Sequence, residues 1–257
     1  MKTFYFITGL PRSGTTLLSS VLNQNPDIYA SISGPLARFV RTIIQESSSQ
    51  GGYKHQCPVE TRKNILYGIF DNYYQSKSQS IIFDTNRGWT LFLPLLKDLF
   101  PYTKVILCVR DIAWILDSFE NLIRKNPYTL TNMFSYEENL NVYTRCDTLM
   151  HPHRTIGFAY TGVKHVITSH EKTMLYILDY EKFCRFPDLT MREIYNFIDK
   201  PYFNHDYNHV DSSYDVFDED VNLPGLHTTR KKLEWIERDM IIPPDIQHKY
   251  SNMEIWK

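Results

Sequence analysis

Short, continuously apolar runs alternate along the chain with longer segments in which apolar residues recur every three or four positions. The runs are TFYFIT at 3–8, SIIFD at 80–84, KVILCV at 104–109 and MLYILDY at 174–180. Apolar residues at every position, rather than at alternate positions, are typical of parallel strands covered by helices on both faces. We therefore predict a mainly parallel sheet built from these segments.

Helical periodicity fills the segments between the predicted strands. The first helix is predicted over 15–25, where apolar residues share one face and Pro26 ends the helix. Further helices are predicted over 35–46, 60–75, 91–99, 112–125, 137–149, 154–170 and 188–199. Strands alternating with helices predict a three-layer α/β fold of the P-loop kind, as a single domain over 1–257. Surface loops are predicted for SSSQGG at 47–52 and for the Asp- and Asn-rich stretch at 204–222.

Charge and composition restrict the kind of ligand. The chain has 257 residues, 28 of them basic and 29 acidic, so an anion site has to be local and general nucleic-acid binding is not expected. No apolar run reaches the about eighteen residues of a membrane helix. The four cysteines form no C-x-x-C pair, which suits a reducing compartment. We expect a cytoplasmic protein.

The stretch GLPRSGTT at 9–16 joins the first predicted strand to the first predicted helix. Its glycines have the G-x-x-x-x-G spacing of a P-loop, whose backbone N–H groups and helix end bind an anion. In ATP and GTP sites a lysine follows the second glycine and reaches the phosphates. Here Thr15 occupies that position and Thr16 follows it. The loop is therefore predicted to bind a shorter anion without a metal ion.

A second anion site is predicted at the end of the third strand. Arg110 follows VILCV directly, and Ser118 lies eight residues further on the next predicted helix. Ligands of α/β folds bind at the carboxyl ends of parallel strands, so Arg110 is expected at the same edge of the sheet as the loop. An arginine in this position can also simply pair with a carboxylate.

Taken together, PRSGTTLL after the first strand and VRD…S after a later one resemble the sulfotransferase family that uses 3′-phosphoadenylyl sulfate (PAPS). The chain is most similar to the small bacterial and tyrosylprotein-type members. The similarity extends to FDTNRGW at 83–89, YEKF at 180–183, PYFNHDYNHV at 201–210 and GLHTTRKKLEW at 225–235.

The resemblance implies transfer of a sulfuryl group from PAPS to a hydroxyl or amine acceptor, with release of adenosine 3′,5′-bisphosphate and no need for a metal ion. The 5′-phosphosulfate would be bound by Arg12, Ser13, Gly14, Thr15 and Thr16. The 3′-phosphate would be bound by Arg110 and Ser118, and the late loop would add His227, Arg230 and Lys231. The pattern also places Arg230 to Lys232 in the first turn of a helix, where a bound phosphate would offset unfavourable positive charge.

Sulfuryl transfer requires a cation near the leaving oxygen and a base near the acceptor. Arg12 is predicted for the first role. Family members use a histidine at a strand end or a glutamate after the first helix, but DTN at 84–86 and YASISGPLARF at 29–39 contain neither. Asp84 is predicted as the base, ionised because the neighbouring Arg87 lowers its pKa. The alternative is a structural capping carboxylate paired with Arg87. His55, Glu46 and His227 are further candidates.

Two other functions remain open at this point. A small-molecule kinase with a degenerate P-loop is disfavoured by the full set of phosphate contacts. A catalytically inactive nucleotide-binding protein is favoured by the missing bases. The pairs His151/His153 and His205/His209 lack a second ligand cluster for zinc, and DVFDEDVN at 215–222 lacks the glycine and terminal glutamate of a calcium loop. No metal site is predicted, and the sequence does not identify the acceptor.

Overall fold

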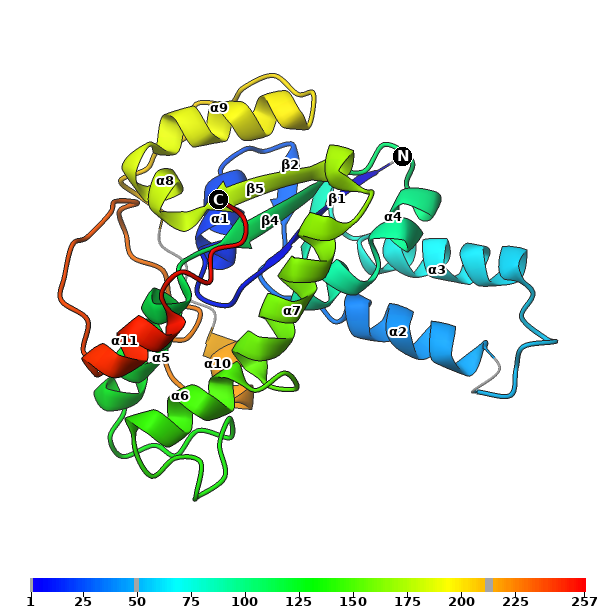
Figure 1. Ribbon diagram of the computed structural model, residues 1–257. Helices are drawn as coiled ribbons and strands as arrows, with labels where there is room; N and C mark the ends of the chain where they lie inside the picture. The colour runs from blue at the N-terminus through cyan, green and yellow to red at the C-terminus, as the bar shows by residue number, and fades with distance from the viewer. Residues whose placement is uncertain (1, 49–50, 211–214) are drawn as a thin grey trace.

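The computed structural model describes residues 2–48, 51–210 and 215–257. At its centre lies an all-parallel sheet of five strands in the order β2-β3-β1-β4-β5 (Figure 1). The strands are β1 (Thr3–Gly9), β2 (Ile28–Ala30), β3 (Ile81–Thr85), β4 (Val105–Val109) and β5 (Leu175–Asp179). All four predicted strands are confirmed. The sequence did not reveal β2, because its three residues are too few to show a pattern.

Helices cover both faces of the sheet, which confirms the three-layer α/β prediction (Figure 1). Predicted helices correspond to α1 (Thr15–Leu22), α2 (Leu36–Glu46), α3 (Val59–Tyr73), α4 (Leu93–Leu99), α5 (Ile112–Lys125), α6 (Val142–Met150), α7 (Thr155–Thr168) and α9 (Pro187–Phe197). Not predicted were α8 (Tyr180–Arg185), α10 (Asp215–Asp220), α11 (Pro244–Tyr250) and the 3₁₀ turns η1 (Arg87–Leu91) and η2 (Lys172–Met174). Within the described ranges, no helix has the length and apolarity required to cross a bilayer.

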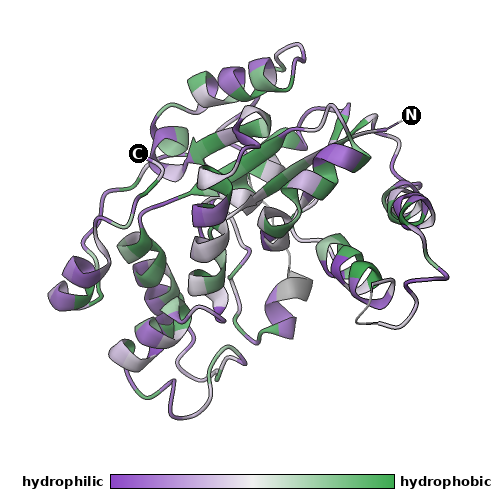
Figure 2. Ribbon diagram, turned by 45° about the vertical axis from the view of Figure 1, so that its right-hand side comes forward, coloured by the Kyte–Doolittle hydropathy of each residue, from purple (hydrophilic) through white to green (hydrophobic). Residues whose placement is uncertain are grey.

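The central strand β1 shows why its sequence is apolar at every position. Phe4 and Phe6 pack into one core cluster with residues of α2 to α7, whereas Tyr5 and Ile7 pack into the other with residues of α1 and α9. Figure 2 shows the hydrophobic strands enclosed by helices whose outer faces are hydrophilic. A sheet buried on both faces offers ligands only its edges and strand ends, so the site lies at the carboxyl ends of the strands.

Two local predictions are wrong. The stretch 204–222 is not all loop, since α10 lies within it. Asp218 in this helix is buried, and His227 is its hydrogen-bond partner. Residues 211–214 lie outside the described part. Arg230 to Lys232 do not begin a helix either. Val210 N donates to Lys231 O and Leu233 N donates to Tyr207 O, so this backbone pairs with the segment before α10. These cations therefore do not lie at a helix N-terminus, and the predicted conflict with a helix dipole does not arise.

Candidate active site

The phosphate loop follows β1 and turns sharply into α1. Gly9 and Gly14 have φ angles of 129° and 89°, and Arg12 between them is also left-handed at 56°. A Cβ on Gly9 would lie 2.0 Å from the carbonyl oxygen of Cys108, which excludes any side chain there. Gly14 is the N-cap of α1 and brings no capping side chain. The first amides of α1 are therefore left for an anion, as the sequence predicts.

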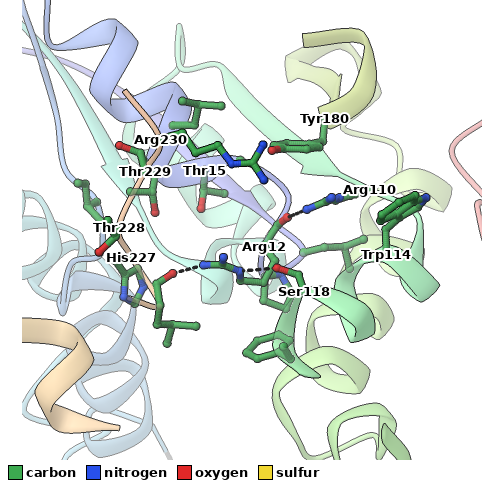
Figure 3. A pocket seen from close by; sticks show the side chains of 18 of the residues that line it. Arg12, Thr15, Arg110, Trp114, Ser118, Tyr180, His227, Thr228, Thr229 and Arg230 are labelled. Atoms are coloured by element: carbon green, nitrogen blue, oxygen red, sulfur yellow. Dashed lines mark hydrogen bonds between the residues drawn. The ribbon is translucent and has the colours of Figure 1, made fainter. Parts of the chain in front are cut away.

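Three segments far apart in the sequence meet at Arg12. Its Nε donates to Ser118 Oγ at 3.1 Å, and its Nη1 donates to the carbonyl oxygen of Leu226 (Figure 3). Arg110 Nη1 donates to the carbonyl oxygen of Arg12 at 3.0 Å. These groups line one cavity of about 460 Å³, together with Gly14, Thr15, Thr16, His227 and Arg230. The structure thus assembles the predicted phosphate loop, the second anion segment and the late loop into one site.

The cavity carries far more positive charge than a chain of net charge −1 would suggest. Its lining contains the cations Arg12, Arg87, Arg110, Arg230, Lys232 and Arg238 and the acids Asp220 and Glu234. Burial, followed by the proximity of Arg110, lowers the pKa of Arg12 to about 10, so that Arg12 remains charged at neutral pH. Burial also lowers the pKa of Arg110. Crowded, partly desolvated guanidinium groups are a costly arrangement that a bound polyanion would relieve.

Arg110 has an incomplete set of hydrogen bonds. Its Nε is buried and has no partner among the described residues. Its guanidinium carbon lies 4.2 Å from the ring centroid of Tyr180 and 5.9 Å from that of Trp114. These aromatic rings, whose contact with Arg110 the sequence did not indicate, fix the guanidinium plane by cation–π contact. A buried donor without a partner fits a site that a ligand anion completes.

Two of the residues predicted to bind the nucleotide lie elsewhere. The side chain of Ser13 is fully buried, and its Oγ is 2.6 Å from Leu10 O and 3.1 Å from Cys108 O. Its hydroxyl therefore closes the loop against β4 instead of facing the cavity. Lys231 is exposed and is not part of the cavity lining, whereas its neighbours Arg230 and Lys232 are. Lys232 forms an ion pair with Glu234 at 2.6 Å.

Asp84 does not have the surroundings that the sequence suggested. It is fully buried, Tyr74 Oη donates to it at 2.5 Å, and Trp89 Nε1 donates to it at 2.7 Å. Burial raises its pKa to about 6 against the effect of these two hydrogen bonds, so the predicted lowering by Arg87 is wrong. Arg87 instead lines the cavity and forms no ion pair with a described side chain. Burial lowers its pKa. Both oxygens of Asp84 are occupied away from the cavity, so the geometry does not favour it as the base.

The raised pKa of Asp84 makes stability depend on pH. The pKa of this carboxyl is near 3.8 in the unfolded chain and near 6 in the folded protein, so its contribution to the free energy of unfolding is fully present below pH 3.8. That contribution is lost as the pH rises through about 6, and over this interval it amounts to about 3 kcal/mol. We expect Asp84→Asn to gain stability relative to the wild type by up to that amount between pH 4 and 7, measured by urea unfolding. A difference between the two proteins that does not change with pH would show that Asp84 is ionised throughout.

Comparison with known proteins agrees with this geometry. The sequence matches the sulfotransferase family over residues 5–204. The fold is similar to that of a sulfotransferase from Alicyclobacillus acidocaldarius, with a TM-score of 0.55, 16% identity and coverage of 97% of this chain and 89% of that chain. It is also similar to the sulfotransferase domain of the Synechococcus PCC 7002 olefin synthase, with a TM-score of 0.52, 18% identity and coverage of 97% and 88%. No curated protein matches the sequence. The family match covers most of the chain and includes both anion-binding segments, and the chain therefore belongs to the sulfotransferase family.

Proposed function

We propose that this protein transfers a sulfuryl group from PAPS to a hydroxyl or amine acceptor and releases adenosine 3′,5′-bisphosphate. The observation that carries the proposal is the convergence of Arg12 from the phosphate loop with Arg110 and Ser118 from the β4–α5 segment on one cationic cavity. A nucleotide with anionic groups at both its 5′ and 3′ positions requires two separated anion sites. The phosphate loop and Arg110 provide such a pair on neighbouring strands of the sheet.

The residues of the phosphate loop suit the 5′-phosphosulfate. The amides at the start of α1 and the hydroxyls of Thr15 and Thr16 are donors for its oxygens. Arg12, which remains charged, stabilises the negative charge that develops on the leaving phosphate oxygen. Arg110, Ser118 and Arg230 would hold the 3′-phosphate. Because these donors are already in position before the reaction starts, the protein does not have to reorganise during transfer. We expect most of the rate acceleration to come from this preorganisation.

Adenosine 3′,5′-bisphosphate should raise the melting temperature by about 5–10 °C at a hundredfold excess over its dissociation constant. The reason is that only the folded protein assembles Arg12, Arg110 and Ser118. Mg-ATP should have little effect, because Thr15 replaces the lysine that reaches the outer phosphates. Differential scanning fluorimetry measures both shifts. Equal stabilisation by Mg-ATP would favour a kinase, and bisphosphate binding without release of labelled sulfate from PAPS would favour an inactive nucleotide-binding protein.

A further inference from the structure

A histidine in the cavity is held in the way that a catalytic base requires. His227 Nδ1 lies 2.7 Å from Asp218 Oδ1, and the backbone N–H of His227 donates to the same carboxylate at 3.0 Å. The side chain of Asp218 is 3% exposed, whereas that of His227 lines the cavity and is 25% exposed. The carboxylate therefore fixes both the loop and the ring of the histidine.

The contact with Asp218 determines where the ring carries its proton. An ionised carboxylate only accepts hydrogen bonds, so Nδ1 of the neutral ring is the protonated nitrogen. The lone pair is consequently on Nε2. The same carboxylate stabilises the positive charge that the ring acquires when Nε2 takes up a proton. Asp218 thus orients the His227 ring, and the ring lines the cavity, which is the arrangement that proton abstraction from a bound acceptor requires.

His227 also lies beside Arg12, the residue proposed to stabilise the leaving oxygen. Arg12 Nη1 donates to the carbonyl oxygen of Leu226, the residue directly before His227. Asp218 is near enough to Arg12 to act on its pKa in the raising direction, although burial and Arg110 outweigh it. In Figure 3, His227 and Arg110 lie on opposite sides of Arg12. His227 is therefore on the flank of the site away from Arg110, which is proposed to hold the 3′-phosphate.

We propose that His227 is the general base of the sulfuryl transfer and that Asp218 is its positioning residue. The inference rests on the proposed function. The acceptor oxygen forms a bond to sulfur while its proton passes to Nε2 of His227. The bond between sulfur and the bridging oxygen breaks, and its electron pair remains on the 5′-phosphate of adenosine 3′,5′-bisphosphate, whose new charge Arg12 stabilises. Charges and atoms balance without a metal or redox partner.

Other acids of the cavity are less suited to the role. Glu234 is engaged by Lys232 at 2.6 Å. Asp220 lines the cavity but is exposed to solvent, and a solvated carboxylate is a weaker base than an imidazole. Asp220 lies two residues from Asp218 and makes a matched control, because Asp220→Asn removes a carboxylate from the same short helix.

The experiment measures loss of the label from ³⁵S-labelled PAPS, as free sulfate when water is the acceptor and as the sulfate ester with a panel of simple phenols and alcohols. His227→Gln should lower kcat by about 10²–10⁴-fold, the usual contribution of a general base. Its dissociation constant for adenosine 3′,5′-bisphosphate should stay within about twofold of the wild-type value, because glutamine leaves the phosphate contacts in place. Added imidazole should raise the kcat of His227→Ala by at least about tenfold, because free imidazole can replace a missing base but not a missing structural side chain.

Asp218→Asn should lower kcat by on the order of 10²-fold while leaving the KM for PAPS unchanged, because the ring loses its fixed tautomer. The melting-temperature shift with bisphosphate shows for each variant whether the nucleotide site is folded. If the wild type binds bisphosphate and releases sulfate while His227→Gln is equally active, the base assignment fails and the proposed function stands. Loss of turnover in Asp220→Asn alone would also overturn it. A wild type that neither binds bisphosphate nor releases sulfate would overturn both.

Discussion

Replacing Arg12 with alanine should lower kcat for sulfuryl transfer by about 10²–10³-fold, the range seen when a fixed donor to a developing oxyanion is removed. Arg12 is held in place by Ser118 Oγ and by the carbonyl oxygen of Leu226, so its guanidinium does not have to reorganise during the reaction. Because its pKa is about 10, it is protonated throughout the neutral range. Its charge should therefore stabilise the transition state more than the bound ground state.

Single-turnover rates with labelled PAPS test this expectation. Arg12→Lys keeps the charge but cannot reproduce the planar fork that bonds both Ser118 and Leu226, so its rate should fall between those of the wild type and the alanine variant. Arg124→Ala is the control, since Arg124 is an exposed arginine and its partner Glu120 keeps a second ion pair with Arg145. An unchanged single-turnover rate in Arg12→Ala would remove Arg12 from the chemistry.

The parts of the site that could be predicted from the sequence are those determined by local backbone geometry. Gly9 and Gly14 have to be glycine because of their positive φ angles and close contacts, and that requirement leaves a readable spacing. Arg110 could be placed because it directly follows a buried strand, and the strand order brings β4 next to β1. The parallel sheet could be predicted because each strand packs against helices on both faces, which makes its residues apolar at every position.

The parts that could not be predicted depend on contacts between distant segments. Asp84 and Arg87 are three residues apart, which suggested a pair, but Tyr74 at the end of α3 reaches the carboxylate instead. Ser13 belongs to the phosphate loop in sequence, yet its hydroxyl turns toward Cys108 on β4. His227 was predicted to contact nucleotide and was only a secondary candidate for the base, because no periodic signal links it to Asp218, nine residues earlier in an acidic stretch. Such partners are selected by packing, which leaves no short-range pattern.

Arg110→Ala should weaken binding of adenosine 3′,5′-bisphosphate by about 2–4 kcal/mol, or about 30- to 1,000-fold in the dissociation constant. Contact with the Tyr180 ring holds the guanidinium, and its buried Nε has no partner among the described residues, so it is available to an anion. The loss should therefore equal that of a charge-assisted hydrogen bond in a desolvated site. Isothermal titration calorimetry at fixed ionic strength measures it. Arg124→Ala again serves as the control for the loss of a distant positive charge.

A second nucleotide separates the two functions that Arg110 could have. Arg110 also donates to the carbonyl oxygen of Arg12, whose left-handed backbone shapes the phosphate loop, so its removal could disturb the 5′ site as well. Adenosine 5′-phosphosulfate has no 3′-phosphate and samples the loop alone. We expect its affinity to change by less than about threefold in Arg110→Ala, because the glycine turn and the amides of α1 remain. If both nucleotides lose affinity equally, Arg110 supports the backbone of Arg12 and does not bind the 3′-phosphate.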